Sequence, residues 1–404
     1  MTFVADTPMA VPMSDGPSPF QPVRFEDRGG LFGLLVKNAV LTFVTLGIYR
    51  FWARAALRRY WWGSINLAGD PFEYTGTGLE LFIGFLMFLA IMLPLALVYG
   101  LTALLEQGNP LAAALLRLPE LLVIFVLIQF VTFRARRYRL SRTVWRGVRA
   151  SQGGTSGQYL GLVVKWTLLG FVTLGLATPW ARMATTRYLT DRTALGDLEA
   201  RFSGRGRDLF LPFVVPYVVF FGSFIGFTAM NVVHSPGIVS MPTGLWILGL
   251  GYIGVLLGLL AYSLIELRYT IRKTRFGDIE LGSTFSVSAI ALRIIGFGFV
   301  ASLALTATVL AAGALAYALG FASPTAPPSV QGIRIVFAVL AFLIGFGLIN
   351  ILRIFWIDKA IVREICETMS MTHIDQLNRI GRSTAPIPKA GEGMADAFDI
   401  GAAF

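Results

Sequence analysis

The sequence has few charged residues for its length. Only 14% of its 404 residues are charged, whereas 55% are hydrophobic, and the mean hydropathy is +0.68. A soluble domain carries about 25% charged residues, because charge must cover its surface. The composition therefore excludes a soluble protein and indicates an integral membrane protein.

The residues that usually carry catalysis are also scarce. The single cysteine, Cys366, allows neither an intramolecular disulfide nor a cysteine-based zinc site. The two histidines, His234 and His373, lie far apart in the sequence. The sequence contains no metalloprotease helix, nucleophile elbow or dinucleotide fingerprint. We therefore expect no enzyme activity, no bound metal and no cofactor.

Eight apolar segments are candidates to cross about 30 Å of hydrocarbon, which takes about 20 helical residues. They are 31–49, 79–104, 112–133, 159–178, 209–233, 244–265, 288–318 and 333–357. The segments between them differ sharply in basic residues. Those rich in arginine are 50–78, 134–158, 182–208 and 265–284, and those without arginine or lysine are 105–111, 234–243 and 319–332. The positive-inside rule places the basic set in the cytoplasm.

Two of the eight segments conflict with that rule. If 159–178 crossed the membrane, the basic segments 134–158 and 182–208 would lie on opposite sides. Treating 31–49 and 159–178 as re-entrant or interfacial removes the conflict and puts both termini in the cytoplasm. Six spans then remain, in the hairpins 79–133, 209–265 and 288–357. Eight spans are the alternative topology.

The two conflicting segments are copies of each other. Residues 33–60 align without gaps on 161–188, at a constant offset of 128, and sixteen of the 28 positions are identical. Phe-Val-Thr-Leu-Gly, Trp-Ala-Arg and Arg-Tyr occur in both copies. Such a match indicates an internal duplication. Because the copies run in the same direction, any pseudo-symmetry axis is expected along the membrane normal.

These patterns predict an all-α integral membrane protein with six to eight membrane segments and small cytoplasmic β-hairpins. The arginines and aromatic residues of 50–62 suit an amphipathic helix at the headgroup level, and turn residues follow it. The expected units are a disordered tail (1–24), a first repeat (25–157), a second repeat (158–287), a third hairpin (288–357) and a cytoplasmic tail (358–404).

Two stretches carry a family resemblance. Residues 173–182 read Thr-Leu-Gly-Leu-Ala-Thr-Pro-Trp-Ala-Arg, and 137–147 read Arg-Tyr-Arg-Leu-Ser-Arg-Thr-Val-Trp-Arg-Gly. Over about 25–382 the chain resembles the YjgN-like family, bacterial inner-membrane proteins classed as a domain of unknown function. The resemblance implies a multi-pass protein of the bacterial inner membrane. That family has no established catalytic or binding residues, so the resemblance assigns no site.

Candidate functional residues come from the duplication. Lys37 and Lys165 are matched lysines within the two anomalous segments, where a charge is costly and often marks a pathway. Gly47 and Gly175 interrupt the same segments, as in transporters with broken helices. The alternative is that both lysines extend to the headgroups from a shallow segment. Candidate contacts to lipid headgroups are Arg54, Arg59, Trp52, Arg182, Arg187, Trp180, Arg137 and Arg142.

Two functions remain open from the sequence. The leading hypothesis is a transporter-like or channel-like protein for a small solute or a lipid. The alternative is a non-catalytic scaffold that binds anionic lipids or a partner protein through its basic cytoplasmic segments. The net charge of +11 favours anionic phospholipids as partners. A protein partner or a second copy is also a candidate, whereas apolar spans beside the arginines argue against nucleic acid.

Overall fold

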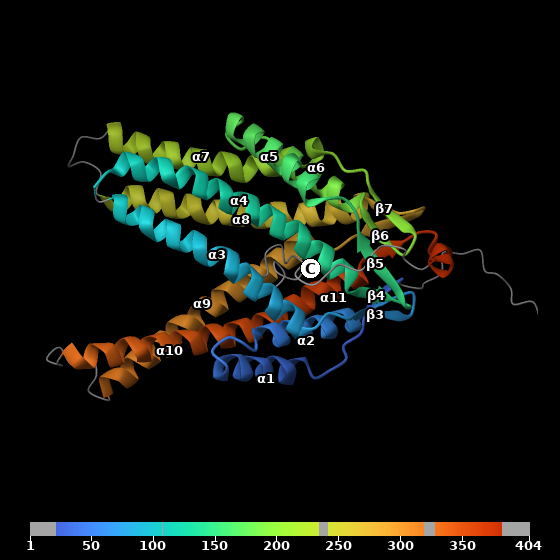
Figure 1. Cartoon of the computed structure of the whole chain (residues 1–404), viewed down its shortest axis with the longest axis horizontal. Helices are drawn as coiled ribbons and strands as arrows, with labels where there is room; N and C mark the ends of the chain where they lie inside the picture. The colour runs from blue at the N-terminus through green and yellow to red at the C-terminus, as the bar shows by residue number, and fades with distance from the viewer. Residues whose placement is uncertain (1–21, 107, 234–240, 319–327, 382–404) are drawn as a thin grey trace, which may run out of the picture.

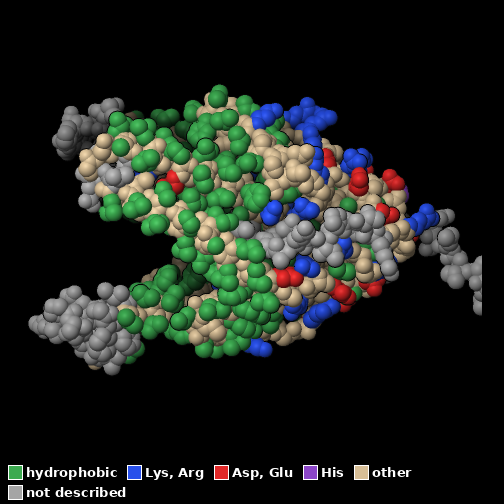
Figure 2. All heavy atoms as spheres, in the orientation of Figure 1, with side chains coloured by type: hydrophobic (Ala, Val, Ile, Leu, Met, Phe, Trp, Pro, Cys, Tyr) green, Lys and Arg blue, Asp and Glu red, His purple; other side chains and the backbone are tan. Residues whose placement is uncertain are grey.

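The structure, a computed structural model, describes residues 22–106, 108–233, 241–318 and 328–381. Long helices occupy one end of the molecule and the strands gather at the other (Figure 1). Hydrophobic side chains cover the helical end, whereas arginine, lysine and acidic side chains gather over the strands (Figure 2). The small number of charged residues is therefore concentrated at one end, as expected of a chain partly immersed in a bilayer.

Six helices among the described residues are long and apolar enough to cross a membrane. They lie in the hairpins α3 (Gly78–Glu106) with α4 (Pro110–Ser141), α7 (Phe210–Val233) with α8 (Met241–Lys273), and α9 (Val287–Ala318) with α10 (Pro328–Leu352). The last span continues through a π-helical turn, η2 (Arg353–Asp358), into α11 (Lys359–Glu367). The chain is a transmembrane protein, and the six-span count agrees with the re-entrant interpretation.

The two anomalous segments form short helical hairpins. The first consists of α1 (Leu31–Val44) and α2 (Arg50–Ser64), and the second of α5 (Ser156–Val172) and α6 (Thr178–Thr190). With 14 residues α1 is about 21 Å long, and with 17 residues α5 is about 26 Å long, so both are shorter than the hydrocarbon core. Each chain reversal also returns the following basic segment to the side from which the hairpin began.

One antiparallel sheet collects all ten described strands in chain order. The strands are β1 (Val23–Phe25), β2 (Ile65–Leu67), β3 (Asp70–Tyr74), β4 (Thr143–Trp145), β5 (Val148–Gln152), β6 (Thr193–Leu195), β7 (Leu198–Phe202), β8 (Thr274–Phe276), β9 (Ile279–Ser283) and β10 (Met369–Met371). The expected small β-hairpins are present, but they do not stand separately. Each pairs with the next, as Glu73 of β3 does with Val144 of β4. The all-α prediction was therefore incomplete.

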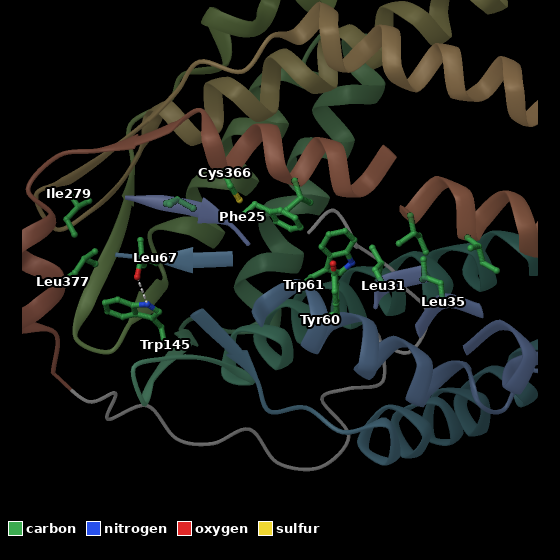
Figure 3. Packing of buried hydrophobic residues seen from close by; sticks show 14 residues of the cluster. Phe25, Leu31, Leu35, Tyr60, Trp61, Leu67, Trp145, Ile279, Cys366 and Leu377 are labelled. Carbon is green, nitrogen blue, oxygen red and sulfur yellow. Dashed lines mark hydrogen bonds between the residues drawn. The ribbon is translucent and has the colours of Figure 1, made fainter. Parts of the chain in front are cut away.

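The main hydrophobic core lies under this sheet (Figure 3). Trp145 is 1% exposed, and its indole nitrogen donates to the carbonyl oxygens of Leu67 and Asp70, both at 3.3 Å. Leu377 and Cys366, which come from the C-terminal part of the chain, belong to the same cluster. Removal of a fully buried aromatic side chain costs about 3–5 kcal/mol. The tryptophan therefore holds neighbouring strands and the C-terminal segment together.

Residues after 358 were expected to form a tail, and the described part of them is instead folded. The 3-10 helix η3 (Ile374–Arg379) follows β10. Gln376 donates to Asp278 at 2.6 Å, and Asn378 accepts from Arg146 at 2.9 Å. The backbone N–H of Gly381 donates to Asp197 at 2.9 Å. The segment thus ties together the turns of three β-hairpins. At the other terminus β1 begins at Val23, and the rest of the expected N-terminal tail lies outside the described residues.

Asp27 links the N-terminal segment to α2 and α11. Its carboxylate accepts from the Tyr60 hydroxyl at 2.7 Å and from the Gly29 backbone N–H at 3.1 Å, and it pairs with the Lys359 ammonium. The hydrogen bonds from Lys359 and then Tyr60 lower the pKa of Asp27 from 3.8 to about 2. Burial, followed by the bond to Asp27, raises the pKa of Tyr60 to about 12. Tyr60 therefore remains a neutral donor.

Substitution of Asp27→Asn should lower the free energy of unfolding at pH 7 by about 1–2 kcal/mol, because a charge-assisted bond is lost at a partly exposed site. Since the folded pKa is depressed, this stabilisation is present above about pH 4 and is lost as the pH falls toward 2. Denaturant unfolding of the purified protein at several pH values measures the difference. The control is Glu26→Gln, an exposed neighbour, and equal effects of the two substitutions would contradict the prediction.

The shared sheet also predicts the topology around α5 and α6. Ser151 in β5 and Ser203 just after β7 must lie on the same side of the membrane, because β6 pairs with both strands. In a Cys366→Ser chain, we expect Ser151→Cys and Ser203→Cys to resist an impermeant thiol reagent in intact cells and to react after permeabilisation. Gly108→Cys, between α3 and α4, should react in intact cells and is the control. Reaction of Ser203→Cys alone from outside would require eight spans.

Candidate functional site

The same turn reverses the chain in both short helical hairpins. Gly47 and Gly175 have φ angles of 91° and 92°, a backbone region in which side chains are strained. The Thr173 hydroxyl donates to the carbonyl four residues earlier at 2.8 Å and accepts from the Ala177 backbone N–H at 3.1 Å. Thr45 makes the corresponding bonds in the first copy. The repeated Thr-Leu-Gly therefore encodes a capped turn between two helices.

The tips of these hairpins are apolar and exposed. Leu46 is 94% exposed and Leu174 72% exposed, and Val44 and Val172 beside them are also exposed. Exposure of such side chains to water costs about 25 cal/mol per Å² of apolar surface. Because neither hairpin is long enough to span, their tips are suited to end within the hydrocarbon. This supports re-entrant elements rather than additional spans.

Two predicted headgroup arginines make matched bonds within the protein. Arg59 donates to the carbonyl of Gly76 at 2.9 Å, and Arg187 donates to the carbonyl of Gly204 at 2.7 Å. Both bonds join the second short helix of a repeat to the segment that enters the following span. A guanidinium has five N–H donors, so contact with a lipid phosphate is still chemically available to each. Their lipid contacts stay a prediction.

The two predicted tryptophans pack against matched glycines. A Cβ at Gly78 would lie 2.7 Å from the Cα of Trp52, and a Cβ at Gly206 would lie 2.7 Å from the Cα of Trp180. Each pair fits the second short helix closely against the start of the next helix. This close fit explains why Trp and Gly recur together in the two copies. These tryptophans hold the fold together whether or not they also contact headgroups.

The remaining predicted arginines of the first repeat lie on α2, on α4 and directly after α4. Arg142 pairs with Glu80 at 2.8 Å, and Tyr138 donates to the same carboxylate at 2.6 Å. Arg54 on α2 and Arg137 on α4 are half-buried. These residues therefore contribute to the junction between helices and sheet, and their contact with lipid is not decided by these positions.

The matched lysines do not lie in a common site with the glycines. Lys37 on α1 and Lys165 on α5 both have exposed side chains. Their helices also pack differently, because α1 contacts α2 and α10 whereas α5 contacts α4 and α6. An exposed lysine on a short interfacial helix suits extension of its ammonium to the headgroups. Their role on a pathway stays a prediction that the structure does not test.

A groove of about 710 Å³ lies along the second helical hairpin. Its lining combines aromatic rings, aliphatic side chains, hydroxyl groups and one cation. The lining residues are Gln129, Tyr159, Val163, Trp166, Thr167, Gly170, Phe171, Leu174, Gly175, Thr178, Ala181, Arg182 and Thr185. Of the predicted site residues, the structure brings Gly175 and Arg182 together here, whereas Lys165, Trp180 and Arg187 do not line the groove.

The two repeats differ at the wall of this groove. Asn38 of α1 is 7% exposed, and its amide nitrogen donates to the carbonyl of Ala53 at 3.4 Å, which joins α1 to α2. The equivalent residue in α5 is Trp166, which lines the groove. Burial raises the pKa of Tyr159, another lining residue, so its hydroxyl is a neutral hydrogen-bond donor. The sequence analysis did not find this wall, because it relied on positions that are identical in the two copies, and Asn38 and Trp166 differ.

Arg182 joins the groove to the membrane helix α8. Its guanidinium lies 3.5 Å from the carboxylate of Glu266, and the two side chains are 58% and 13% exposed. On the other side of the hairpin, the Tyr217 hydroxyl of α7 donates to the carbonyl of Leu174 at 3.2 Å. Glu266 was not among the site residues predicted from the sequence. No local pattern in the sequence pairs it with Arg182, because the two lie 84 positions apart.

Substitution of Gly175→Ala should lower the free energy of unfolding by about 1–2 kcal/mol, because a Cβ is strained at that positive φ. Gly170→Ala is the matched control within the same groove. Gly170 lies inside a helix with open space around the added Cβ, so this change should be neutral or should stabilise by up to about 1 kcal/mol. Thermal unfolding in detergent compares them, and an equal loss from both would contradict the turn assignment.

Comparison with known proteins places the chain in a family. A family model described as "Bacterial protein of unknown function (DUF898)" matches residues 20–397. The chain is 33% identical over 127 residues to the inner membrane protein YjgN of Salmonella typhimurium, which covers 31% of this chain and 29% of that protein. It is 29% identical over 120 residues to YjgN of Escherichia coli K12. That match covers 30% of this chain and 28% of the relative.

The matched region is thus less than a third of the length of these curated relatives. No solved structure matches the chain. The family model, in contrast, covers most of the sequence, including both short helical hairpins and all six long helices. This agrees with the resemblance that the repeated Thr-Leu-Gly and Trp-Ala-Arg motifs carry. The chain belongs to the YjgN-like family of bacterial membrane proteins of unknown function, DUF898.

Proposed function

We propose that this protein is a transporter-like membrane protein that binds phospholipids of the cytoplasmic leaflet and moves them toward the opposite leaflet. The observation that carries the proposal is the groove along α5 and α6. It has an apolar and aromatic wall near the tip of a re-entrant hairpin, and its lining includes the Arg182 cation. An amphipathic ligand has the same two parts, an apolar chain and a charged headgroup.

The arrangement of the groove fits a lipid better than a small polar solute. Phe171 and Leu174, near the hairpin tip, offer apolar contact to an acyl chain. Arg182 on α6 offers a positive charge and N–H donors to a phosphate. The hydroxyls of Thr178 and Thr185 beside it donate to backbone carbonyl oxygens. A groove along a re-entrant hairpin would let a headgroup travel beside protein while its acyl chains remain in the hydrocarbon.

The family and the distribution of basic residues support a location in the bacterial inner membrane. The curated relatives are named inner membrane proteins, and six long apolar helices are present. With the positive-inside rule, the arginine-rich sheet faces the cytoplasm, as do both ends of the chain. The protein is then a multi-pass protein of the bacterial inner membrane, with the groove opening toward the inner leaflet.

The basic end of the molecule supports a second function, a scaffold. Figure 2 shows arginine and lysine side chains over the strands and the adjoining helix ends. Such a surface attracts anionic lipids by about 1 kcal/mol for each basic residue near the membrane. A scaffold depends on many arginines together, whereas a lipid transporter depends on the groove. Single substitutions in the groove therefore separate the two functions.

Substitution of Arg182→Ala should slow lipid movement about tenfold, because a charge-assisted contact to the phosphate is lost. Purified protein in vesicles with a fluorescent phospholipid is treated with an impermeant quencher, which reports lipid that reaches the outer leaflet. The matched control is Arg201→Ala, an exposed arginine paired with Glu199 in the sheet. Lys37→Ala and Lys165→Ala in the same assay test whether the lysines lie on the pathway.

Two results would contradict the proposal, the first for the transport function and the second for the groove as its route. Wild-type protein that moves lipid no faster than protein-free vesicles would exclude transport. Equal rates for Arg182→Ala, Arg201→Ala and wild type would exclude the groove as the route. Retained binding to anionic vesicles without lipid movement would favour the scaffold.

A further inference from the structure

Three polar residues lie close together beside the groove, one on α6 and two on α8. Arg182 on α6 lines the groove, and its guanidinium faces the carboxylate of Glu266 at 3.5 Å. Tyr262 lies four residues before Glu266, which puts both on the same face of α8. Tyr262 also packs in the same buried cluster as Met183 of α6, the residue that follows Arg182. A cation, a carboxylate and a phenol are thus grouped beside the groove.

Among the described residues, the Tyr262 hydroxyl has no hydrogen-bond partner. The residue is 3% exposed. Its ring is held edge-on against Phe213 at 5.5 Å, within an apolar cluster. A buried hydroxyl without a partner destabilises the folded protein, because it has lost its hydrogen bonds to water. This unmet capacity is a feature of a site that a ligand completes.

The ion pair beside it is also incomplete. A charge-assisted N–H···O bond has a length of about 2.7–2.9 Å, so the 3.5 Å separation is loose. A carboxylate accepts about four hydrogen bonds, and Arg182 is the single partner recorded for Glu266 among the described residues. With Arg182 58% exposed, the guanidinium can turn toward the groove and leave the carboxylate for another cation.

The two charges together discriminate between headgroups. A phosphate that binds Arg182 lies next to Glu266, so a purely anionic headgroup meets a negative charge. A headgroup that also carries an ammonium places that cation against the carboxylate. A primary ammonium has N–H donors for Glu266 and for the Tyr262 oxygen, whereas a quaternary ammonium has none.

We propose that the groove selects a zwitterionic phospholipid with a primary ammonium, in which Arg182 binds the phosphate and Glu266 with Tyr262 binds the ammonium. This assignment rests on the proposed lipid function and specifies its ligand. It also differs from the anionic phospholipids that the net charge favours. Those lipids suit the basic sheet, where arginines predominate, rather than the groove, where a carboxylate lies beside the cation.

The test is competition for a fluorescent phosphatidylethanolamine bound to the purified full-length protein in detergent. Unlabelled phosphatidylethanolamine should compete about tenfold better than phosphatidylglycerol, with phosphatidylcholine between them. Glu266→Gln should remove this preference, because the amide keeps the shape but not the charge, and Glu266→Asp should retain part of it. Tyr262→Phe should weaken the binding of phosphatidylethanolamine more than the binding of phosphatidylglycerol. Glu199→Gln, at an exposed pair in the sheet, is the matched control.

Each result decides between the proposals. Equal competition by phosphatidylglycerol, or an unchanged preference in Glu266→Gln that unfolds at the wild-type temperature, overturns the headgroup assignment and leaves lipid binding intact. Absence of saturable lipid binding overturns the lipid function as well. Competition by water-soluble phosphoethanolamine at the same concentration as the lipid shows that the site takes the free headgroup, which overturns the lipid assignment.

Discussion

Continuous backbone pairing across ten strands is the constraint on which the rest of the structure depends. Each strand hydrogen-bonds its neighbour in chain order, from β1 to β10. The chain leaves this sheet as a pair of helices and must come back to the same end to form the next strand. Helices between successive β-hairpins therefore occur in pairs, and every described membrane-length helix belongs to a hairpin. The sheet in this way determines an even number of spans between its strands.

The same constraint explains the short helical hairpins. Strand β5 pairs with β6, and α5 and α6 connect them, so the two helices must return the chain to the same side. With 17 and 13 residues, neither helix is long enough to cross the bilayer. The capped turn at Thr173 and Gly175 makes that reversal possible, and the apolar tip keeps it in the hydrocarbon. A groove with both apolar and polar walls is a consequence of a helical hairpin that ends part of the way into a membrane.

Much of the architecture follows from local pattern. Long apolar runs predicted eight candidate segments, and the positive-inside rule favoured six spans over eight, in agreement with the six long apolar helices. The duplication predicted that 31–49 and 159–178 behave alike, which their matching turns confirm. Turn residues predicted β-hairpins but not their union, because short strands carry no information on which neighbour they pair with. The folded segment after residue 358 was likewise missed, since its partners lie at the distant turns around Arg146, Asp197 and Asp278.

Some residues of the candidate site were predicted from the sequence, and others were found only in the tertiary structure. Gly175 and Arg182 were found from sequence because duplication marks them within one short stretch. Glu266 and Tyr262 belong to a different helix, and only the packing of α6 beside α8 sets them next to Arg182. The sequence by itself determined a membrane protein, its repeat and the matched behaviour of the two short segments, because these depend on composition and on residues close in the chain. The tertiary structure decided the single sheet and the polar group beside the groove, because both depend on contacts between distant segments.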